Sequence, residues 1–245
     1  MRGLVLAAGR GSRLGPFTTD RPKCLVELAG STLLERQVAA LRAAGAREVG
    51  VVTGWHSEAV RATGLPTFHN SRWASTTMVG SLATAREWLL DEPLLAGYGD
   101  IIYGAATASA LAAQDVPLAI AYDPDWESLW RKRFSQPLGD AETFALDDSG
   151  FVVDIGGKPR TTADVRGQYI GLVRWTPQAW AAVESAGVDP ALDMTGLLRH
   201  LVAERLVPVT AIPVADPWCE FDHPSDLEVG LDIARALDDI AVRAS

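Results

Sequence analysis

The sequence predicts an α/β fold in which a mainly parallel mixed sheet is flanked by helices. Short apolar runs alternate along the chain with longer stretches whose apolar residues recur at helical spacing. This alternation is typical of strand–helix units around a parallel sheet. The chain has 245 residues, of which 48% are hydrophobic and 22% charged, so it can bury a large core. We therefore expect residues 1–245 to form a single domain.

The first strand and the first helix carry the clearest signals. The apolar run at residues 3–8 ends at a glycine-rich loop, which indicates a buried strand. The helix at residues 33–44 is predicted to begin with a Thr32-x-x-Glu35 capping box and to end at Gly45. Similar patterns predict further strands at residues 48–53, 66–69, 94–99, 117–122, 169–175 and 207–214. They predict further helices at residues 56–63, 76–89, 105–113, 177–185, 194–204 and 226–241. The expected architecture is Rossmann-like.

Residues 123–166 interrupt this alternation. The segment is rich in tryptophan, charged residues and turn signals, and Asp147-Asp148-Ser149-Gly150 is typical of a hairpin turn. We expect it to be an insertion that folds over the sheet and covers the site of the second substrate, the acceptor.

Composition limits the classes of partner. The formal net charge is −9 and the isoelectric point is near 4.9, which argues against binding to nucleic acid. No apolar run approaches the ~20 residues needed to cross a bilayer, so we expect no membrane partner. The two cysteines, Cys24 and Cys219, are too few for a disulfide framework and indicate buried thiols in a reducing, cytoplasmic compartment. A homodimer is left open.

The densest functional signal is the loop after the first strand. It reads Leu6-Ala7-Ala8-Gly9-Arg10-Gly11-Ser12-Arg13-Leu14 and is followed by Arg21-Pro22-Lys23. Glycines just past a strand allow backbone N–H groups to approach a polyphosphate, and nearby cations neutralise it. The alternative is that Gly9 and Gly11 only form a turn. A dinucleotide site is disfavoured because the second strand ends in Thr53-Gly54-Trp55 without an acid, and no Walker A lysine follows the loop.

Three carboxylates form an independent signal. Asp100 follows a buried strand and should lie at the carboxyl edge of the sheet, where ligands bind in open α/β folds. Glu220 and Asp222 alternate with apolar residues in period two, which places them on one face of a short strand. A Ser225-x-x-Glu228 capping box is predicted to begin the last helix. The three carboxylates suit a hard divalent cation such as Mg²⁺; solvated acids at a strand end are the alternative.

The glycine loop together with Pro22-Lys23 resembles the signature of the sugar-phosphate nucleotidylyltransferase-like family. Its members join a nucleoside triphosphate to a phosphorylated small molecule and release pyrophosphate. The resemblance implies that Gly11, Arg13 and Lys23 hold the triphosphate, with Arg13 and Lys23 as catalytic residues. It also implies that Asp100, Glu220 and Asp222 bind Mg²⁺.

Segments farther along resemble the cytidylyltransferase branch that activates phosphonates, with phosphocholine enzymes next closest. These segments are His69-Asn70-x-x-Trp73 with Ser75–Leu82, Tyr98-Gly99-Asp100, Trp130-x-x-Arg133-Phe134 with Pro137–Thr143, Gln168–Gly171 and Trp218–Asp222. The nucleotide is then expected to contact the loop and two side chains farther along, namely Leu6, Ala7, Ala8, Gly9, Gly11, Ser12, Asn70 and Ser81. A turn role for Asn70 and a helix-face role for Ser81 remain alternatives.

The insertion is expected to supply the acceptor contacts. The guanidinium of Arg133 suits a phosphonate, and Lys158 is a second candidate anion contact. Asp140 and Glu142 are candidates for holding a cationic amine. Trp73, Trp126 and Trp130 leave open an aromatic box for a quaternary ammonium.

The sequence therefore predicts a Mg²⁺-dependent cytidylyltransferase. It is expected to transfer CMP from CTP to a small phosphonate, of the 2-aminoethylphosphonate or 2-hydroxyethylphosphonate type, and to release pyrophosphate. Two alternatives of the same chemistry are transfer to phosphocholine and transfer to a sugar 1-phosphate. A third alternative, without catalysis, is a nucleotide-binding regulatory module.

Overall fold

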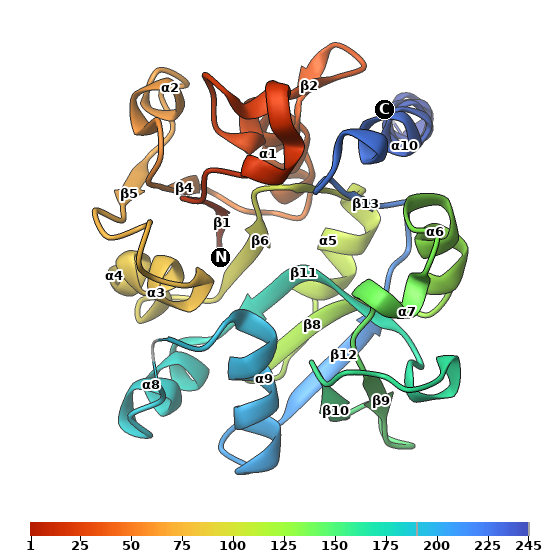
Figure 1. Ribbon diagram of the computed structural model, residues 1–245. Coiled ribbons are helices and arrows are strands. Elements are labelled where there is room, and N and C mark those ends of the chain that lie inside the picture. Colours follow the sequence, from red (N-terminus) through yellow and green to blue (C-terminus); the bar gives the residue numbers. More distant parts are fainter. Residues whose placement is uncertain (190, 245) are drawn as a thin grey trace.

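A seven-stranded sheet runs through the centre of the protein (Figure 1). The computed structural model describes residues 1–189 and 191–244. From edge to edge the strands are β12 (Val209–Pro213), β8 (Leu118–Asp123), β11 (Gln168–Trp175), β6 (Leu94–Tyr98), β1 (Arg2–Ala7), β4 (Val49–Thr53) and β5 (Thr67–His69). β11 runs antiparallel to both of its neighbours, whereas the other pairs in this sheet are parallel. The predicted mainly parallel mixed sheet is confirmed.

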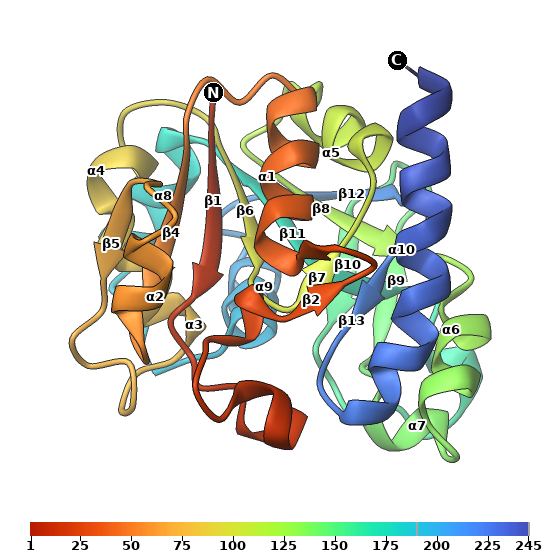
Figure 2. The same cartoon turned by 90° about the horizontal axis from the view of Figure 1, so that it is seen from above.

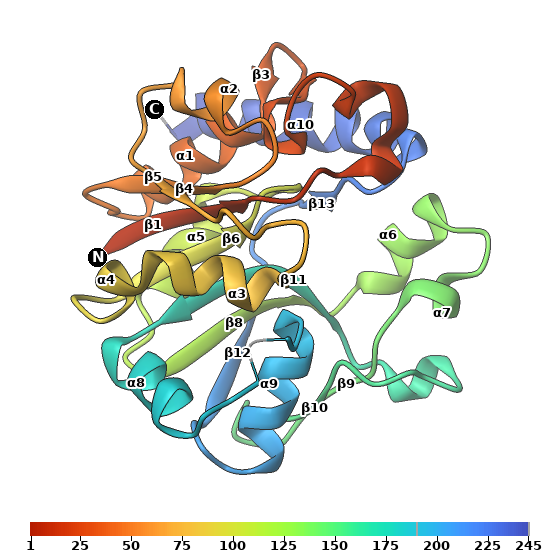
Figure 3. The same cartoon turned by 60° about the vertical axis from the view of Figure 1, so that its left-hand side comes forward.

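Helices cover both faces of the sheet, as Figure 3 shows. One face carries α1 (Leu33–Ala43), α5 (Ala105–Ala112) and α10 (Pro224–Ala244), and the other carries α3 (Met78–Leu82), α4 (Arg86–Leu89), α8 (Pro177–Ser185) and α9 (Met194–Ala203). Buried side chains form a separate hydrophobic cluster on each side of the sheet. The short helix α2 (Ser57–Arg61) leads into the edge strand β5.

Helix α1 forms as the sequence predicts. The Thr32 hydroxyl accepts a hydrogen bond from the backbone N–H of Glu35, and the Glu35 carboxylate accepts one from the backbone N–H of Thr32. This capping box satisfies donors that the first helical turn leaves without partners. Leu34, Val38 and Leu41 are buried on the face that packs toward the sheet.

The insertion contains α6 (Trp126–Arg133), α7 (Pro137–Asp140) and a hairpin of β9 (Phe144–Leu146) and β10 (Val152–Ile155). The N–H of Gly150 donates to the carbonyl of Asp147 at 3.1 Å, which confirms the predicted turn. Figure 2 shows α6 and α7 beside the N-terminal half of α10, away from the β5 edge of the sheet.

Three local predictions are wrong. The helix predicted at residues 76–89 is divided into α3, a 3₁₀ turn at Ala83–Ala85 and α4, because Ala85 leaves helical geometry. The strand predicted around residues 218–222 is reduced to β13 (Cys219–Glu220), which pairs with β7 (Ile101–Ile102). The last helix begins at Pro224, two residues earlier than predicted, because the Asp226 carboxylate accepts the N–H of His223 in place of the expected Ser225 cap.

The remaining short elements lie near the first loop and along the insertion. They are the strands β2 (Glu27–Leu28) and β3 (Ser31–Thr32) and the 3₁₀ turns at Ser12–Thr18, Lys23–Leu25 and Thr162–Asp164. Cys24 and Cys219 are buried free thiols, as expected. Among the described residues, no helix is both long enough and apolar enough to cross a membrane.

Candidate active site

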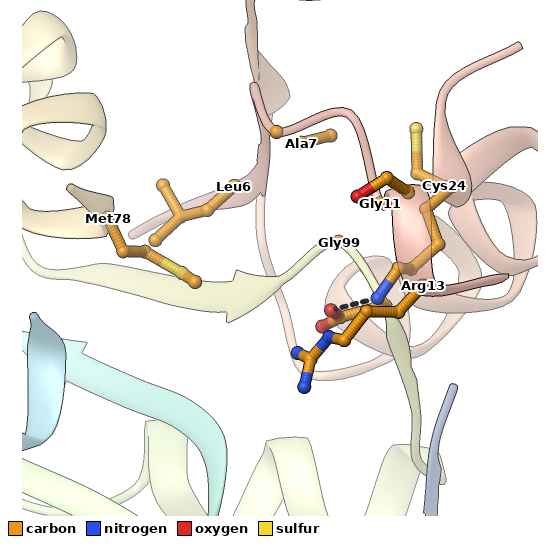
Figure 4. Close-up of a pocket in the computed structure, with 11 residues that line it drawn as sticks. Leu6, Ala7, Gly11, Arg13, Cys24, Met78 and Gly99 are labelled. Atoms are coloured by element: carbon orange, nitrogen blue, oxygen red, sulfur yellow. Dashed lines mark hydrogen bonds and ion pairs between the residues drawn. The ribbon is translucent and has the colours of Figure 1, made fainter. Parts of the chain in front are cut away.

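Two adjoining cavities lie at the carboxyl ends of the central strands. The first, here called the loop cavity, has a volume of about 270 Å³ and is lined mainly by the segment that follows β1 (Figure 4). The second, here called the acidic cavity, has a volume of about 350 Å³ and is lined by the insertion, β11 and the segment around β13. Arg13, Met78 and Asp100 line both cavities. Ligands in the two cavities would therefore meet at Asp100.

Backbone conformation brings Lys23 into the loop cavity. Gly11 has a φ of 64°, in the left-handed region that favours glycine. A Cβ atom at this position would lie 2.8 Å from Cε of Lys23. Gly11 therefore provides both the turn and the space along which the lysine side chain extends.

A short ladder between β7 and β13 brings the three predicted carboxylates together. Glu220 pairs with Ile101, and the N–H of Phe221 donates to the carbonyl of Asp100 at 2.9 Å. Carboxylate oxygens of Asp100, Glu220 and Asp222 then lie within 4.8 Å of one another. The predicted convergence is confirmed, although the strand that supplies it is shorter than expected.

Two basic side chains contact this carboxylate cluster. Nζ of Lys23 lies 2.9 Å from Oδ2 of Asp100 and 2.9 Å from Oδ1 of Asp222. Nη2 of Arg13 donates to the same Oδ1 of Asp222 at 2.8 Å. Lys23 is almost fully buried, whereas most of the Arg13 side chain is exposed.

The electrostatics follow from this arrangement. Burial alone lowers the pKa of Lys23, but the Asp100 and Asp222 carboxylates outweigh it and raise that pKa. Burial raises the pKa of Asp222, but the ammonium of Lys23, together with the guanidinium groups of Arg13 and Arg133, outweighs burial and lowers it. Burial, followed by the charges of Asp100 and Asp222, raises the pKa of Glu220 to about 8. The ionised form of Glu220 is therefore disfavoured beside the two neighbouring carboxylates unless a further cation is present.

The donor set fits a hard divalent cation. Oδ1 of Asp100 is buried and has no hydrogen-bond partner among the described residues, so the lone pairs of this oxygen are free to bind a cation. Carboxylate oxygens are the ligands that Mg²⁺ and Mn²⁺ prefer. Asp100, Glu220 and Asp222 could hold such an ion.

The acidic cavity has a wall of carboxylates beyond the cluster. Asp140, Glu142 and Asp193 line it. Burial raises the pKa of Glu142, although a hydrogen bond of 3.2 Å from Thr195 Oγ1 partly offsets this effect. Gln168 fixes the backbone beside it, because its Nε2 donates to the carbonyl of Glu142. A wall of this kind is complementary to a cationic amine.

The predicted triphosphate residues and most of the predicted nucleotide contacts of the glycine loop line the loop cavity. These residues are Leu6, Ala7, Gly9, Gly11, Ser12, Arg13 and Lys23. Ala8 is not among the lining residues, because it is buried and its carbonyl accepts the N–H of Trp55.

Asn70 and Ser81 lie outside both cavities. The Asn70 side-chain amide donates to Thr76 Oγ1 at 2.8 Å and to Ser81 Oγ at 3.0 Å, and its oxygen accepts the N–H of Arg72. Asn70 is only 4% exposed. These contacts close a local turn, which favours the turn role for Asn70; contact of either side chain with a nucleotide stays a prediction.

Arg133 and Lys158 also lie outside the acidic cavity. The Arg133 guanidinium is fully buried and paired with Glu220 and Asp226. Nζ of Lys158 donates to the carbonyls of Leu138 and Gly139. Both predicted anion contacts are therefore engaged with the protein itself. Of the tryptophans considered for an aromatic box, Trp130 lines the cavity, and Trp218 joins it there.

Several lining residues were not predicted. Asp193 and Thr195 enter the acidic cavity from the start of α9, more than 50 residues after Glu142. Nothing local marks Asp193 as more than a helix cap, because its carboxylate accepts the N–H of Gly196. Gly171 lines the same cavity with a φ of 84°, at a bulge in β11 beside Tyr98.

Comparison with known proteins identifies what the chain is similar to. The sequence model of the MobA-like NTP transferase domain matches residues 3–142. The chain is 33% identical to CTP:phosphoglutamine cytidylyltransferase from Campylobacter jejuni over 254 residues, which cover 95% of this chain and 100% of that protein. It is 35% identical to CMP-5′-(3-aminopropyl)phosphonate synthase from Streptomyces rubellomurinus over 129 residues, or 49% of this chain and 20% of that protein.

A solved structure shares the whole fold. CTP:phosphocholine cytidylyltransferase from Streptococcus pneumoniae superposes with a TM-score of 0.72 at 20% identity, covering 95% of this chain and 98% of that one. This likeness supports the fold.

Proposed function

Because the chain belongs to the MobA-like NTP transferase domain family, we propose that it is a cytidylyltransferase that transfers CMP from CTP to a small acceptor and releases pyrophosphate. The acceptor combines a phosphate or phosphonate group with a cationic amino group. The observation that carries this proposal is the meeting of the two cavities at Asp100, beside Glu220 and Asp222.

The loop cavity suits the triphosphate of CTP. The chain as a whole is acidic, so a triphosphate needs positive charge placed locally. The loop cavity supplies it through backbone N–H groups after β1 and the side chains of Arg13 and Lys23. Lys23 and Arg13 would leave their carboxylate partners for the phosphates and stabilise the charge that develops on the departing pyrophosphate. Mg²⁺, when bound by Asp100, Glu220 and Asp222, would add positive charge at the phosphates that react.

The acidic cavity suits the acceptor. Its carboxylates would attract an amino group, while the phosphoryl end lies toward Asp100 and the loop cavity. The acceptor oxygen is already anionic, so the chain needs to align it for attack on the α-phosphorus and need not supply a strong base. Asp140, Glu142 and Asp193 would therefore select acceptors with a positive charge.

The acceptor class proposed here is wider than the phosphonates expected from the sequence. One relative aligned over 95% of this chain is named for phosphoglutamine, and a phosphonate relative aligns over about half of this chain. The class still includes 2-aminoethylphosphonate, but the carboxylate wall gives no reason to favour the uncharged tail of 2-hydroxyethylphosphonate. A binding module without turnover is disfavoured because Arg13, Lys23, Asp100 and Asp222 are in direct contact.

Pyrophosphate release tests the proposal. The protein would be incubated with CTP, Mg²⁺ and one acceptor at equal concentration, namely 2-aminoethylphosphonate, phosphoglutamine, phosphocholine, 2-hydroxyethylphosphonate or glucose 1-phosphate. We expect release with an aminated phosphate or phosphonate. Release of pyrophosphate with phosphocholine alone would indicate that Trp130 and Trp218, rather than the carboxylates, bind the cationic group of the acceptor. Release with glucose 1-phosphate alone would refute the requirement for an amine.

A further inference from the structure

We propose that Asp226 and Arg133 are positioning residues for the cation-binding carboxylates, so that they set the affinity of the site without contacting the ion. This inference rests on the proposed function, because it assigns the two residues to the cation site described above. Sequence patterns alone would place Arg133 on the acceptor and would leave Asp226 as an ordinary first-turn acid of α10.

Asp226 fixes the segment that carries Glu220 and Asp222. Its Oδ2 accepts the backbone N–H of Asp222 at 2.8 Å and the backbone N–H of His223 at 2.9 Å. These bonds hold the chain between β13 and α10 in the turn that directs the Asp222 carboxylate toward Lys23. Asp226 is fully buried, so no water competes for its oxygens.

Arg133 links Asp226 to the side chain of Glu220. Its Nε and Nη2 donate to the two carboxylate oxygens of Asp226 at 3.1 and 3.3 Å. Its remaining Nη1 donates to Oε2 of Glu220 at 3.1 Å. A planar guanidinium can hold both carboxylates at fixed angles, which an ammonium cannot do.

Aromatic packing fixes the orientation of this guanidinium. Cζ of Arg133 lies 5.2 Å from the ring centre of Trp130 and 4.9 Å from that of Phe134. Trp130 Nε1 in turn donates to Oδ2 of Asp140 at 3.0 Å, in the wall of the acidic cavity. The insertion thus reaches the cation site through Arg133, and its packing adjusts where Glu220 lies.

A purely structural role for the pair is the competing explanation, because it also joins α6 to α10. The chain contains a matched control in Arg36 and Asp238. Arg36 makes a two-pronged ion pair of 2.6 and 3.1 Å with Asp238 and joins α1 to the same helix α10. Asp238→Asn should alter the anchoring of α10 and leave cation affinity unchanged.

Water proton relaxation with Mn²⁺ separates the two roles without any turnover. The probe is Mn²⁺ added to the protein with CTP and no acceptor, since relaxation enhancement distinguishes the ion on the protein from the ion on free CTP. Variants Glu220→Gln and Asp222→Asn define the site by losing the enhancement. We expect Asp226→Asn and Arg133→Lys to need roughly 10–100-fold more Mn²⁺, as is typical for outer-shell partners. Excess Mn²⁺ should restore their turnover.

The outcomes are distinct. Enhancement curves for folded Asp226→Asn and Arg133→Lys that match the wild-type curve, while Asp222→Asn loses binding, would overturn this inference and leave the proposed function intact. Wild-type protein without enhancement would overturn both. Arg133→Lys keeps the positive charge and provides the test if Asp226→Asn does not fold. If neither variant folds, the pair serves only stability and the inference is refuted.

Discussion

Nζ of Lys23 lies 2.9 Å from Oδ1 of Asp222, although 199 residues separate the two in sequence. The contact joins the glycine loop at the start of the chain to the carboxylate segment near its end. In the proposed reaction the same ammonium leaves Asp222 and pairs with the phosphates of CTP. The Asp222 carboxylate is then available to a divalent cation. The pair therefore connects nucleotide binding to cation binding.

Lys23→Ala should lower kcat by a factor on the order of 10²–10³, because it removes a preorganised cation at the triphosphate. Pyrophosphate release at saturating CTP measures the effect. Arg21→Ala is the matched control, since Arg21 is exposed and pairs only with the adjacent Asp20 among the ion pairs of the described residues. Equal turnover in the two variants would remove Lys23 from the reaction.

Gly11→Ala should lower both stability and kcat. A non-glycine residue in the left-handed region costs about 1–2 kcal/mol, and here the new Cβ would also displace the Lys23 side chain, 2.8 Å away. Gly150→Ala is the control, because Gly150 also has a positive φ, of 82°, but no neighbouring atom lies within 4 Å of its Cβ position. The melting temperature should decrease in both variants, whereas kcat should decrease only in Gly11→Ala. A fall of similar size in both turnover rates would contradict the steric argument.

Protonation of Glu142 should weaken binding of an aminated acceptor as pH falls. Burial raises its pKa above the ordinary value of 4.5, so on acidification it takes up a proton at a higher pH than an exposed glutamate does. The KM for 2-aminoethylphosphonate should therefore rise as pH falls, beginning above pH 4.5. The corresponding KM for 2-hydroxyethylphosphonate, which has no amine, should not follow this dependence.

Glu142→Gln tests the same assignment by stability as well as by KM. Because the pKa of Glu142 is raised in the folded protein, its contribution to the free energy of unfolding is greatest at low pH and is lost as pH rises through that raised pKa. The variant should thus melt at an equal or higher temperature at pH 7 and should bind the aminated acceptor more weakly at every pH. An unchanged KM would exclude Glu142 from amine binding.

Asn70→Ala should destabilise the protein and leave the KM for CTP nearly unchanged. The substitution removes hydrogen bonds to Thr76, Ser81 and the backbone of Arg72 in a buried turn, at a cost of roughly 1–3 kcal/mol. Denaturant unfolding and CTP kinetics on the same preparation measure both quantities. A stable variant with a strongly raised KM for CTP would identify Asn70 as a nucleotide contact.

Local patterns were sufficient to predict the fold class and the carboxylate cluster. The α1 capping box involves residues close in sequence, and strand ends bring Asp100 to the edge where ligands bind. Period-two alternation correctly placed Glu220 and Asp222 together, although Asp222 lies beyond β13, because the hydrogen bond from the Phe221 N–H to the Asp100 carbonyl continues the pairing past Glu220.

The partners of Arg133 and Asn70 could not be predicted in this way. The local sequence around a buried, ion-paired arginine looks the same as that around an arginine that binds a ligand. Arg133 is buried because it pairs with Asp226, which is 93 residues away. Asn70 and Asp193 each satisfy local backbone groups, and whether their side chains also reach a cavity depends on packing between distant segments. Such roles are set by tertiary contacts that no local spacing encodes.

The most direct test of the central claim is the identity of the product formed from CTP, Mg²⁺ and an aminated phosphate or phosphonate. Mass spectrometry should detect the acceptor joined to CMP, in equal amount to the pyrophosphate released, with CTP preferred over UTP, ATP and GTP. Asp222→Asn should abolish both products. Binding of CTP without a conjugate from any acceptor of the panel, or equal use of the other nucleotides, would contradict the assignment as a cytidylyltransferase.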